Sequence, residues 1–240
     1  MAIAKSMLGR LRGKLGNLSC YEGQDGQTIV RSSSVHRRTS NMEQQRQETE
    51  FGTLSKVAAI LGYVLKTGFP KGKGVAAGSK GFLQANLKGG AVVAEEVDPG
   101  KEFVRKENAP RYFRGQVDYA KLQVAAGAVA VPEASVAEIG GGTEDGSRTA
   151  KAVRRVRFRS EGRTRVGYDC FPEDRVHGVA LCPSKKMRSM VEVGVRGETG
   201  EAEAEFDGKE WQGEVHFYAF ATSADGKRAS RSVYLGMMNW

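Results

Sequence analysis

The sequence has few of the residues that form metal centres and disulfide frameworks. Its 240 residues include three cysteines and three histidines, and no Cys-x-x-Cys pair. The cysteines are Cys20, Cys170 and Cys182, and the histidines are His36, His177 and His216. An odd number of scattered cysteines indicates free thiols in a reducing compartment. Because zinc ligands cluster at short spacings, we expect no metal site and no other cofactor.

Long apolar runs are also missing. No segment approaches the ~18 apolar residues of a membrane-spanning helix, so we expect no membrane insertion. Near the N-terminus, cations at positions 5, 10, 12 and 14 interrupt the apolar residues that a secretory signal would need. We therefore expect no signal peptide and either a cytoplasmic location or export from the cell by a route that needs no signal peptide.

Catalytic motifs are absent or incomplete. Residues 72–80 are rich in glycine and lysine, but three residues rather than four separate Gly74 from Gly78, and the lysine follows the serine. The order of the nucleotide-binding P-loop is therefore not met. Cys182 has His177 or His216 as a candidate base, but no glycine-rich elbow would expose it as a nucleophile. We expect a protein that is not an enzyme.

Glycine and positive charge, in contrast, are abundant. The chain has 31 glycines and a net charge of +9 at neutral pH. Residues 1–115 contain 19 Lys and Arg against 10 Asp and Glu, whereas residues 116–240 contain 18 of each kind. The excess positive charge therefore belongs to the first half, which marks it as the part that meets an acidic partner. We accordingly expect two regions, 1–115 and 116–240.

The first region begins with a predicted β-hairpin. Two short apolar segments, residues 15–21 and 27–32, flank a loop that contains an Asp-Gly pair. This arrangement is typical of two antiparallel strands joined by a tight turn. Residues 91–115, at the other end of the region, have no regular pattern.

Two helices are predicted between these segments. Apolar residues recur at helical spacing over positions 51–65, and Gly68 ends the pattern. Ser40 and Glu43 have the spacing of a capping box at the start of this helix. A shorter helix is expected over residues 78–87.

The second region has the pattern of an all-β domain. Short strands are expected at residues 121–124, 129–134, 151–159, 175–182, 187–193, 201–206, 214–222 and 228–234. Turn signals separate them, and one of these is the run of three glycines at residues 140–142, within the glycine-rich tract 139–146. About seven short strands without a long helix favour an immunoglobulin-like or fibronectin-III-like sandwich. The predicted fold class of the whole chain is therefore α+β.

Two of these strands carry charges of opposite sign. The charged positions are Arg155, Arg157 and Arg159 on one strand and Glu201, Glu203 and Glu205 on the other. In each strand apolar residues alternate with the charges, so all three charged side chains share one face. Taken alone, the basic strand would suggest a site for nucleic acid or an acidic ligand. Because the two strands are neighbours in a sandwich of this type, we expect a structural ladder of ion pairs that fixes their register.

The cations of the first region are candidate contacts with a partner. They lie in an N-terminal arm, a linker and a loop, at Lys5, Arg10, Arg12, Lys14, Arg37, Arg38, Lys71 and Lys73. We expect a non-enzymatic structural or assembly protein that binds an acidic protein partner or forms a homo-oligomer. The alternative is sequence-independent binding of nucleic acid by residues 1–115, with an affinity that falls steeply with salt.

Both ends of the sequence resemble one protein family. Residues 13–17 read Gly-Lys-Leu-Gly-Asn and precede the hairpin, and residues 215–226 read Val-His-Phe-Tyr-Ala-Phe-Ala-Thr-Ser-Ala-Asp-Gly. These motifs resemble an uncharacterised family from Bacteroidetes and their phages that is classed as a domain of unknown function. The family's Pro-x-Thr-x-x-Gln cluster is missing before the long helix. The resemblance implies a two-part architecture, no catalytic residues, and a structural role in prophage or virion particles.

Overall fold

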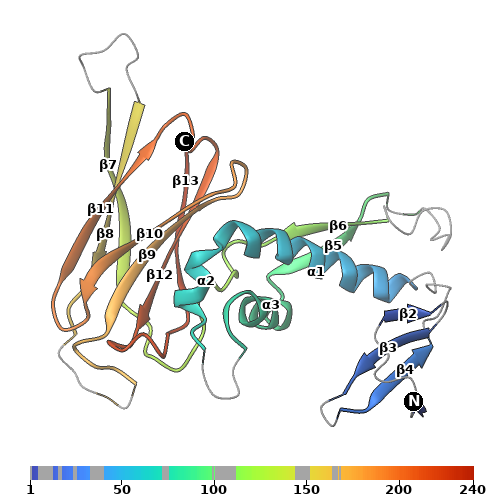
Figure 1. Cartoon of the computed structure of the whole chain (residues 1–240). Helices are drawn as coiled ribbons and strands as arrows, with labels where there is room; N and C mark the ends of the chain where they lie inside the picture. Colours follow the sequence, from blue (N-terminus) through green and yellow to red (C-terminus); the bar gives the residue numbers. More distant parts are fainter. Residues whose placement is uncertain are drawn as a thin grey trace.

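The computed structural model describes residues 2–4, 13–15, 18–23, 26–32, 41–71, 76–98, 100, 112–143, 152–163, 167 and 169–240. Over these residues the chain is α+β, with more strand than helix, and its sheets are antiparallel. Figure 1 shows a two-sheet unit formed by the C-terminal half, helices that lie against it, and a small sheet near the N-terminus.

The N-terminal sheet has four short strands. They are β1 (Ala2–Ala4), β2 (Gly13–Leu15), β3 (Leu18–Glu22) and β4 (Thr28–Ser32), in the order β1-β4-β3-β2. Strands β3 and β4 form the predicted hairpin, which is confirmed. None of the hydrophobic clusters among the described residues includes a residue of this sheet.

Helix α1 (Met42–Leu61) begins with a capping box. The side chain of Asn41 accepts a hydrogen bond from the backbone N–H of Gln44 at 2.8 Å, and the Gln44 side chain accepts from the Asn41 N–H at 3.0 Å. The prediction of Ser40 and Glu43 as the box is therefore wrong by one residue. Both pairs have suitable side chains at the same spacing, so the sequence pattern alone did not separate them.

The long predicted helix is divided in two. Gly62 adopts φ 46° and ψ −106°, and a second short helix, α2 (Tyr63–Gly68), follows it. A positive φ is readily adopted by glycine, which makes the break inexpensive at this position. The shorter predicted helix is confirmed as α3 (Gly78–Gly89), which ends at Gly90 in the left-handed conformation.

Strands β5 (Val92–Glu96) and β6 (Phe113–Val117) form a two-stranded ribbon beside α1 (Figure 1). The expectation that residues 91–115 lack regular structure is therefore wrong. The boundary expected between residues 115 and 116 falls inside β6.

The C-terminal half forms two sheets. Its strands are β7 (Ala134–Thr143), β8 (Ala152–Ser160), β9 (Arg175–Cys182), β10 (Met187–Val195), β11 (Gly200–Asp207), β12 (Glu214–Thr222) and β13 (Val233–Asn239). One sheet has the order β10-β9-β12-β13 and the other β11-β8-β7. The predicted strands at residues 175–182 and 214–222 coincide with β9 and β12.

Other strand predictions for this half are wrong. Residues 121–124 do not form a strand. Of the strand expected at 129–134, Val129 forms an isolated parallel bridge with Ser230, residues 130–133 are not in a strand, and Ala134 is the first residue of β7. Strand β7 continues to Thr143 through the three glycines at 140–142 expected to form a turn, with a register shift between Glu138 and Gly140. A glycine-rich sequence can extend along a neighbouring strand, because backbone hydrogen bonds need no side chain.

Three layers share two hydrophobic cores. Between the sheets, Val156 and Phe158 of β8 belong to the same buried cluster as Phe217 of β12. On the other face of β12, Tyr218 and Phe220 share a second cluster with helical residues such as Leu54. Strands β9 and β12 are therefore buried on both faces, and the helices are part of the same folded body as the sheets.

Candidate functional site

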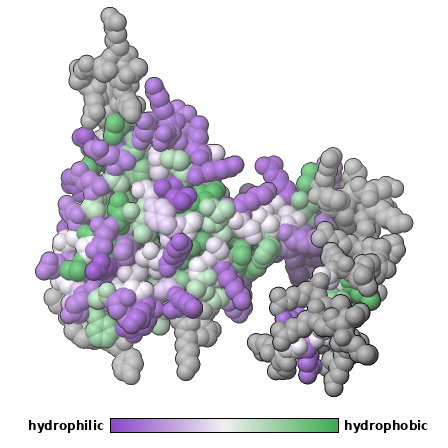
Figure 2. All heavy atoms as spheres, in the orientation of Figure 1, coloured by the Kyte–Doolittle hydropathy of each residue, from purple (hydrophilic) through white to green (hydrophobic). Residues whose placement is uncertain are grey.

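The charged strands β8 and β11 pair with opposite charges side by side. Arg155, Arg157 and Arg159 lie opposite Glu205, Glu203 and Glu201, respectively. The shortest ion pair joins Arg157 Nη2 to Glu203 Oε1 at 2.7 Å, and the carboxylate raises the pKa of the guanidinium through this hydrogen bond and its charge. The structure therefore shows the register that the sequence predicts, and these cations have partners within the chain. Figure 2 shows hydrophilic side chains over much of the surface of the two-sheet unit.

The predicted partner-binding cations lie mostly outside the described residues. Six of them are outside: Lys5, Arg10, Arg12, Arg37, Arg38 and Lys73. Lys14 lies in β2. Lys71 lies shortly after the end of α2, and its side chain is exposed. Whether these residues contact a partner stays a prediction.

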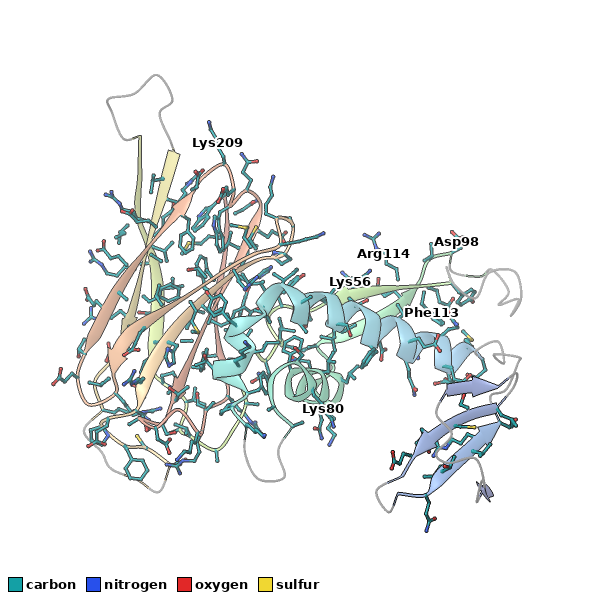
Figure 3. All side chains as sticks on the ribbon, viewed as in Figure 1. Lys56, Lys80, Asp98, Phe113, Arg114 and Lys209 are labelled. Atoms are coloured by element: carbon teal, nitrogen blue, oxygen red, sulfur yellow. The ribbon has the colours of Figure 1, made fainter. Side chains whose placement is uncertain are left out.

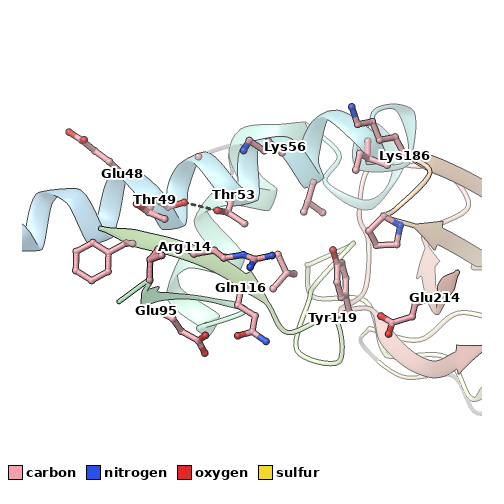
Figure 4. A pocket seen from close by; sticks show the side chains of 18 residues that line it. Glu48, Thr49, Thr53, Lys56, Glu95, Arg114, Gln116, Tyr119, Lys186 and Glu214 are labelled. Carbon is pink, nitrogen blue, oxygen red and sulfur yellow. Dashed lines mark hydrogen bonds between the residues drawn. The ribbon is translucent and has the colours of Figure 1, made fainter. Parts of the chain in front are cut away.

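A groove that the sequence did not predict lies between α1 and the β5–β6 ribbon (Figure 4). It has a volume of about 1230 Å³. Residues from successive turns of α1 form one wall of the groove, and all five residues of β6 form the other. The turn between β9 and β10 closes one end. Elements from distant parts of the sequence therefore meet at one surface.

Glycine allows the helix and the ribbon to approach at the floor of this groove. A Cβ atom at Gly115 of β6 would overlap the side chain of Thr53 of α1. Thr53 does not need a partner across the groove, because its hydroxyl donates to the Thr49 carbonyl at 2.8 Å. The close contact fixes the ribbon against the helix and so fixes the shape of the groove.

Three cations from three elements line the groove. They are Lys56 of α1, Arg114 of β6 and Lys186 of the β9–β10 turn. All three are exposed, and within the described part of the chain none of them makes an ion pair. Figure 3 shows Lys56 and Arg114 on the same side of the molecule, whereas Lys80 of α3 lies on another side.

The acidic residues of the groove, in contrast, have neighbours. When the Gln116 side-chain amide is oriented with its nitrogen toward Glu95, it donates to both carboxylate oxygens, at 2.8 and 2.9 Å. Gln45 donates to Glu48 at 3.2 Å, and Glu214 Oε2 lies 3.9 Å from His216 Nε2. These neighbours are mostly neutral and leave the carboxylates charged, so the lining holds three anions beside its three cations. What distinguishes the cations is that their side chains have no hydrogen-bond or ion-pair partner within the described residues.

Tyr119 lines the end of the groove near β12, and two further rings, His216 and Tyr234, pack behind it. Tyr119 stacks on His216 with ring centroids 4.2 Å apart, and His216 Nδ1 lies 3.2 Å from the Tyr234 hydroxyl. Burial lowers the pKa of His216 below the ordinary value, and the charge of Glu214 opposes this shift. The ring is therefore mainly neutral at pH 7, and it acts as a packing surface rather than a fourth cation.

The residues that the sequence named as a candidate nucleophile and bases have hydrogen-bond partners other than one another in the structure. The Cys182 thiol is buried and donates to the Gln212 carbonyl at 3.6 Å. His177 Nε2 lies 3.0 Å from the Thr222 hydroxyl. The described part of the chain also holds no cluster of three or more metal-ligating side chains.

Comparisons of the chain with protein-family models, curated proteins and solved structures find no match. No helix within the described ranges has both the length and the apolar composition required to cross a bilayer.

Sequence reasoning missed the groove because its residues come from segments more than a hundred positions apart. One local signal was present. Over residues 113–117 apolar or small residues alternate with polar ones, which is the period of a half-buried strand. That alternation could have identified β6, but not its contact with α1.

Proposed function

We propose that this protein is a non-enzymatic assembly or interaction protein whose basic first region binds an acidic protein partner. One observation carries the proposal: the arginines of the β8–β11 ladder are paired within the chain, whereas Lys56, Arg114 and Lys186 surround a groove without ion-pair partners in the described structure. Unpaired charges that converge on a concave surface attract a ligand of opposite charge.

The two-sheet unit suits the role of a scaffold in this proposal. Its strand order, β10-β9-β12-β13 against β11-β8-β7, and the parallel bridge between Val129 and Ser230 support an immunoglobulin-like or fibronectin-III-like sandwich. A sandwich of this kind is a rigid framework on which a binding surface can be held, and the function depends on the site that it carries. A role in prophage or virion assembly, implied by the resemblance of the chain's two ends, agrees with this proposal.

A binding measurement tests the proposal against nucleic acid. Fluorescently labelled poly-glutamate and a single-stranded oligonucleotide are each titrated with the full chain at two salt concentrations, about 50 and 200 mM. The variant is Lys56→Gln, Arg114→Gln and Lys186→Gln. The matched control removes three exposed helical cations outside the groove, as Lys66→Gln, Lys80→Gln and Lys88→Gln.

We expect poly-glutamate to bind, with an affinity that falls as salt rises. The groove variant should bind roughly tenfold more weakly, because each exposed charge contributes up to about 1 kcal/mol, and the control should change affinity by at most about twofold. Failure of poly-glutamate to bind, or equal losses in both variants, contradicts the proposal. Binding of the oligonucleotide in preference to poly-glutamate supports nucleic-acid binding instead.

A further inference from the structure

The hydrogen bonds of the ribbon show which side of β6 is open. The Val97 N–H donates to the Tyr112 carbonyl at 2.9 Å, and the Asp118 N–H donates to the Ala91 carbonyl at 2.9 Å. In an antiparallel pair the residues that bond to the neighbouring strand alternate with residues that point away from it. The even-numbered residues of β6 therefore bond to β5, and Phe113, Gly115 and Val117 direct their N–H and C=O groups away from it.

This outer edge of β6 faces the groove. All five residues of β6 line the groove, whereas the β5 side contributes Glu95 and, directly after the strand, Val97. Among the described strands, β6 pairs with β5 alone. No backbone hydrogen bond from another described segment reaches the outward groups of Phe113, Gly115 or Val117. An open strand edge of this kind is a template for a further strand.

We propose that the edge of β6 receives an extended acidic segment of the partner as a third strand of the ribbon. A strand opposite the five residues of β6 would be ~17 Å long and would bond to their three outward-facing residues. The inference rests on the proposed function, because the acidic character of the segment comes from the unpaired cations of the groove. The cations would attract the acidic segment, and the backbone hydrogen bonds of β6 would fix its extended conformation and position.

The charges around the edge favour this occupant over a second copy of the chain. Residues 1–115, which include the first three residues of β6, carry 19 cations and 10 anions, so two copies meeting at this edge would repel each other. Lys56, Arg114 and Lys186 would instead attract carboxylates on the added segment. Nucleic acid lacks the alternating amide groups that a strand edge requires.

The experiment uses synthetic peptides and the full chain. The parent peptide alternates Glu and Val over about eight residues. Two analogues carry backbone N-methyl groups, one at every Glu and one at every Val, and a third peptide replaces Glu by Lys. N-methylation removes N–H donors and leaves the charges unchanged. Affinity is measured by titration, and amide hydrogen exchange of β6 is followed by NMR.

We expect the parent peptide to bind and at least one N-methylated analogue to bind roughly tenfold more weakly, because each strand edge uses one alternate set of N–H groups. Exchange at Phe113, Gly115 and Val117 should slow at least about tenfold on binding, whereas exchange at Gln116, whose N–H points toward β5, should stay the same. The Lys peptide should not bind.

The failures are distinguishable. If both N-methylated analogues bind as well as the parent and exchange on β6 is unchanged, the strand addition is wrong while the acidic-partner function stands. If no acidic peptide or poly-glutamate binds, the proposed function itself is wrong. Dimerisation of the unliganded chain through β6, detected by light scattering and protection of the same three amides, would also overturn the inference.

Discussion

Arg157 of β8 and Glu203 of β11 face each other on the solvent side of the two-sheet unit, with Nη2 2.7 Å from Oε1. The same opposition of charge recurs at the neighbouring positions of both strands. The cations of this face are thus paired within the chain, whereas Lys56, Arg114 and Lys186 of the groove have no ion-pair partner among the described residues.

Reversing one charge of the ladder should have a small effect that the second reversal restores. Both side chains of the Arg157–Glu203 pair are exposed, at 43% and 49%, so water screens their attraction. Arg157→Glu should lower the melting temperature by no more than ~2–4 °C, and adding Glu203→Arg should recover most of the loss. Thermal unfolding monitored by circular dichroism measures both. A double variant as unstable as the single one would show that the pairing contributes nothing to the fold.

Breaking the buried ion pair should be far more damaging. Arg196 and Asp174 are each only 2% exposed, with Arg196 Nε 3.5 Å from Asp174 Oδ2, and the guanidinium also donates to the carbonyls of Ala130 and Val131. Asp174→Ala leaves a buried charge without its counterion, which should cost ~3–5 kcal/mol of unfolding free energy. Urea denaturation measures it. The control Glu192→Ala, which removes an exposed partner of Arg175, should cost at most ~1 kcal/mol.

Asn86 joins α3 to the segment that leads toward the sheets. It is fully buried, donates to the Phe82 and Gln123 carbonyls at 2.9 Å, and accepts from the Gln123 N–H at 2.7 Å. Asn86→Leu keeps the branching and the number of heavy atoms of the side chain but leaves the Gln123 backbone groups without partners, so we expect a loss of ~1–3 kcal/mol in urea denaturation. Gln84→Leu on the exposed face of α3 should change stability by less than ~0.5 kcal/mol. Equal effects would mean that these hydrogen bonds do not hold α3 in place.

Acid should destabilise the fold through two buried histidines. Burial lowers the pKa of His177 and His216 below the ordinary value of 6.5. The unfolded chain therefore binds protons more readily, so stability is full above pH 6.5 and falls as the pH drops toward the lowered native pKa values. Urea midpoints at pH 7.5 and about 5.5 measure the loss, which His216→Gln should reduce. A midpoint that does not change between these pH values would contradict the prediction.

The strands of the C-terminal half could be predicted where side-chain alternation was strong. The charged alternation around Arg157 and Glu203 gave both strands and their pairing, because two complementary faces can match in few registers. Strand β7 was missed because its glycines carry no side-chain pattern, and its pairing with β8 depends on the backbone. The division of the long helix at Gly62 was not predicted, since a glycine inside a helical pattern weakens a helix without always ending it.

The groove could not be predicted for a different reason. Its walls come together through tertiary packing, in which Gly115 allows Thr53 of α1 to approach β6. Lys186 reaches the same surface from a turn whose strand belongs to the two-sheet unit. A single sequence shows that these residues are charged or small, but the distance between them depends on the completed fold.

The most direct test of the account is to locate an acidic ligand on the chain by NMR. Backbone amide shifts are recorded as the alternating Glu-Val peptide is added at low salt, for the full chain and for the Lys56→Gln, Arg114→Gln, Lys186→Gln variant. The account predicts that the largest shifts of the full chain lie along α1, β6 and the β9–β10 turn, and that the variant loses them. Shifts that centre on the β8–β11 ladder, or that persist unchanged in the variant, would contradict it.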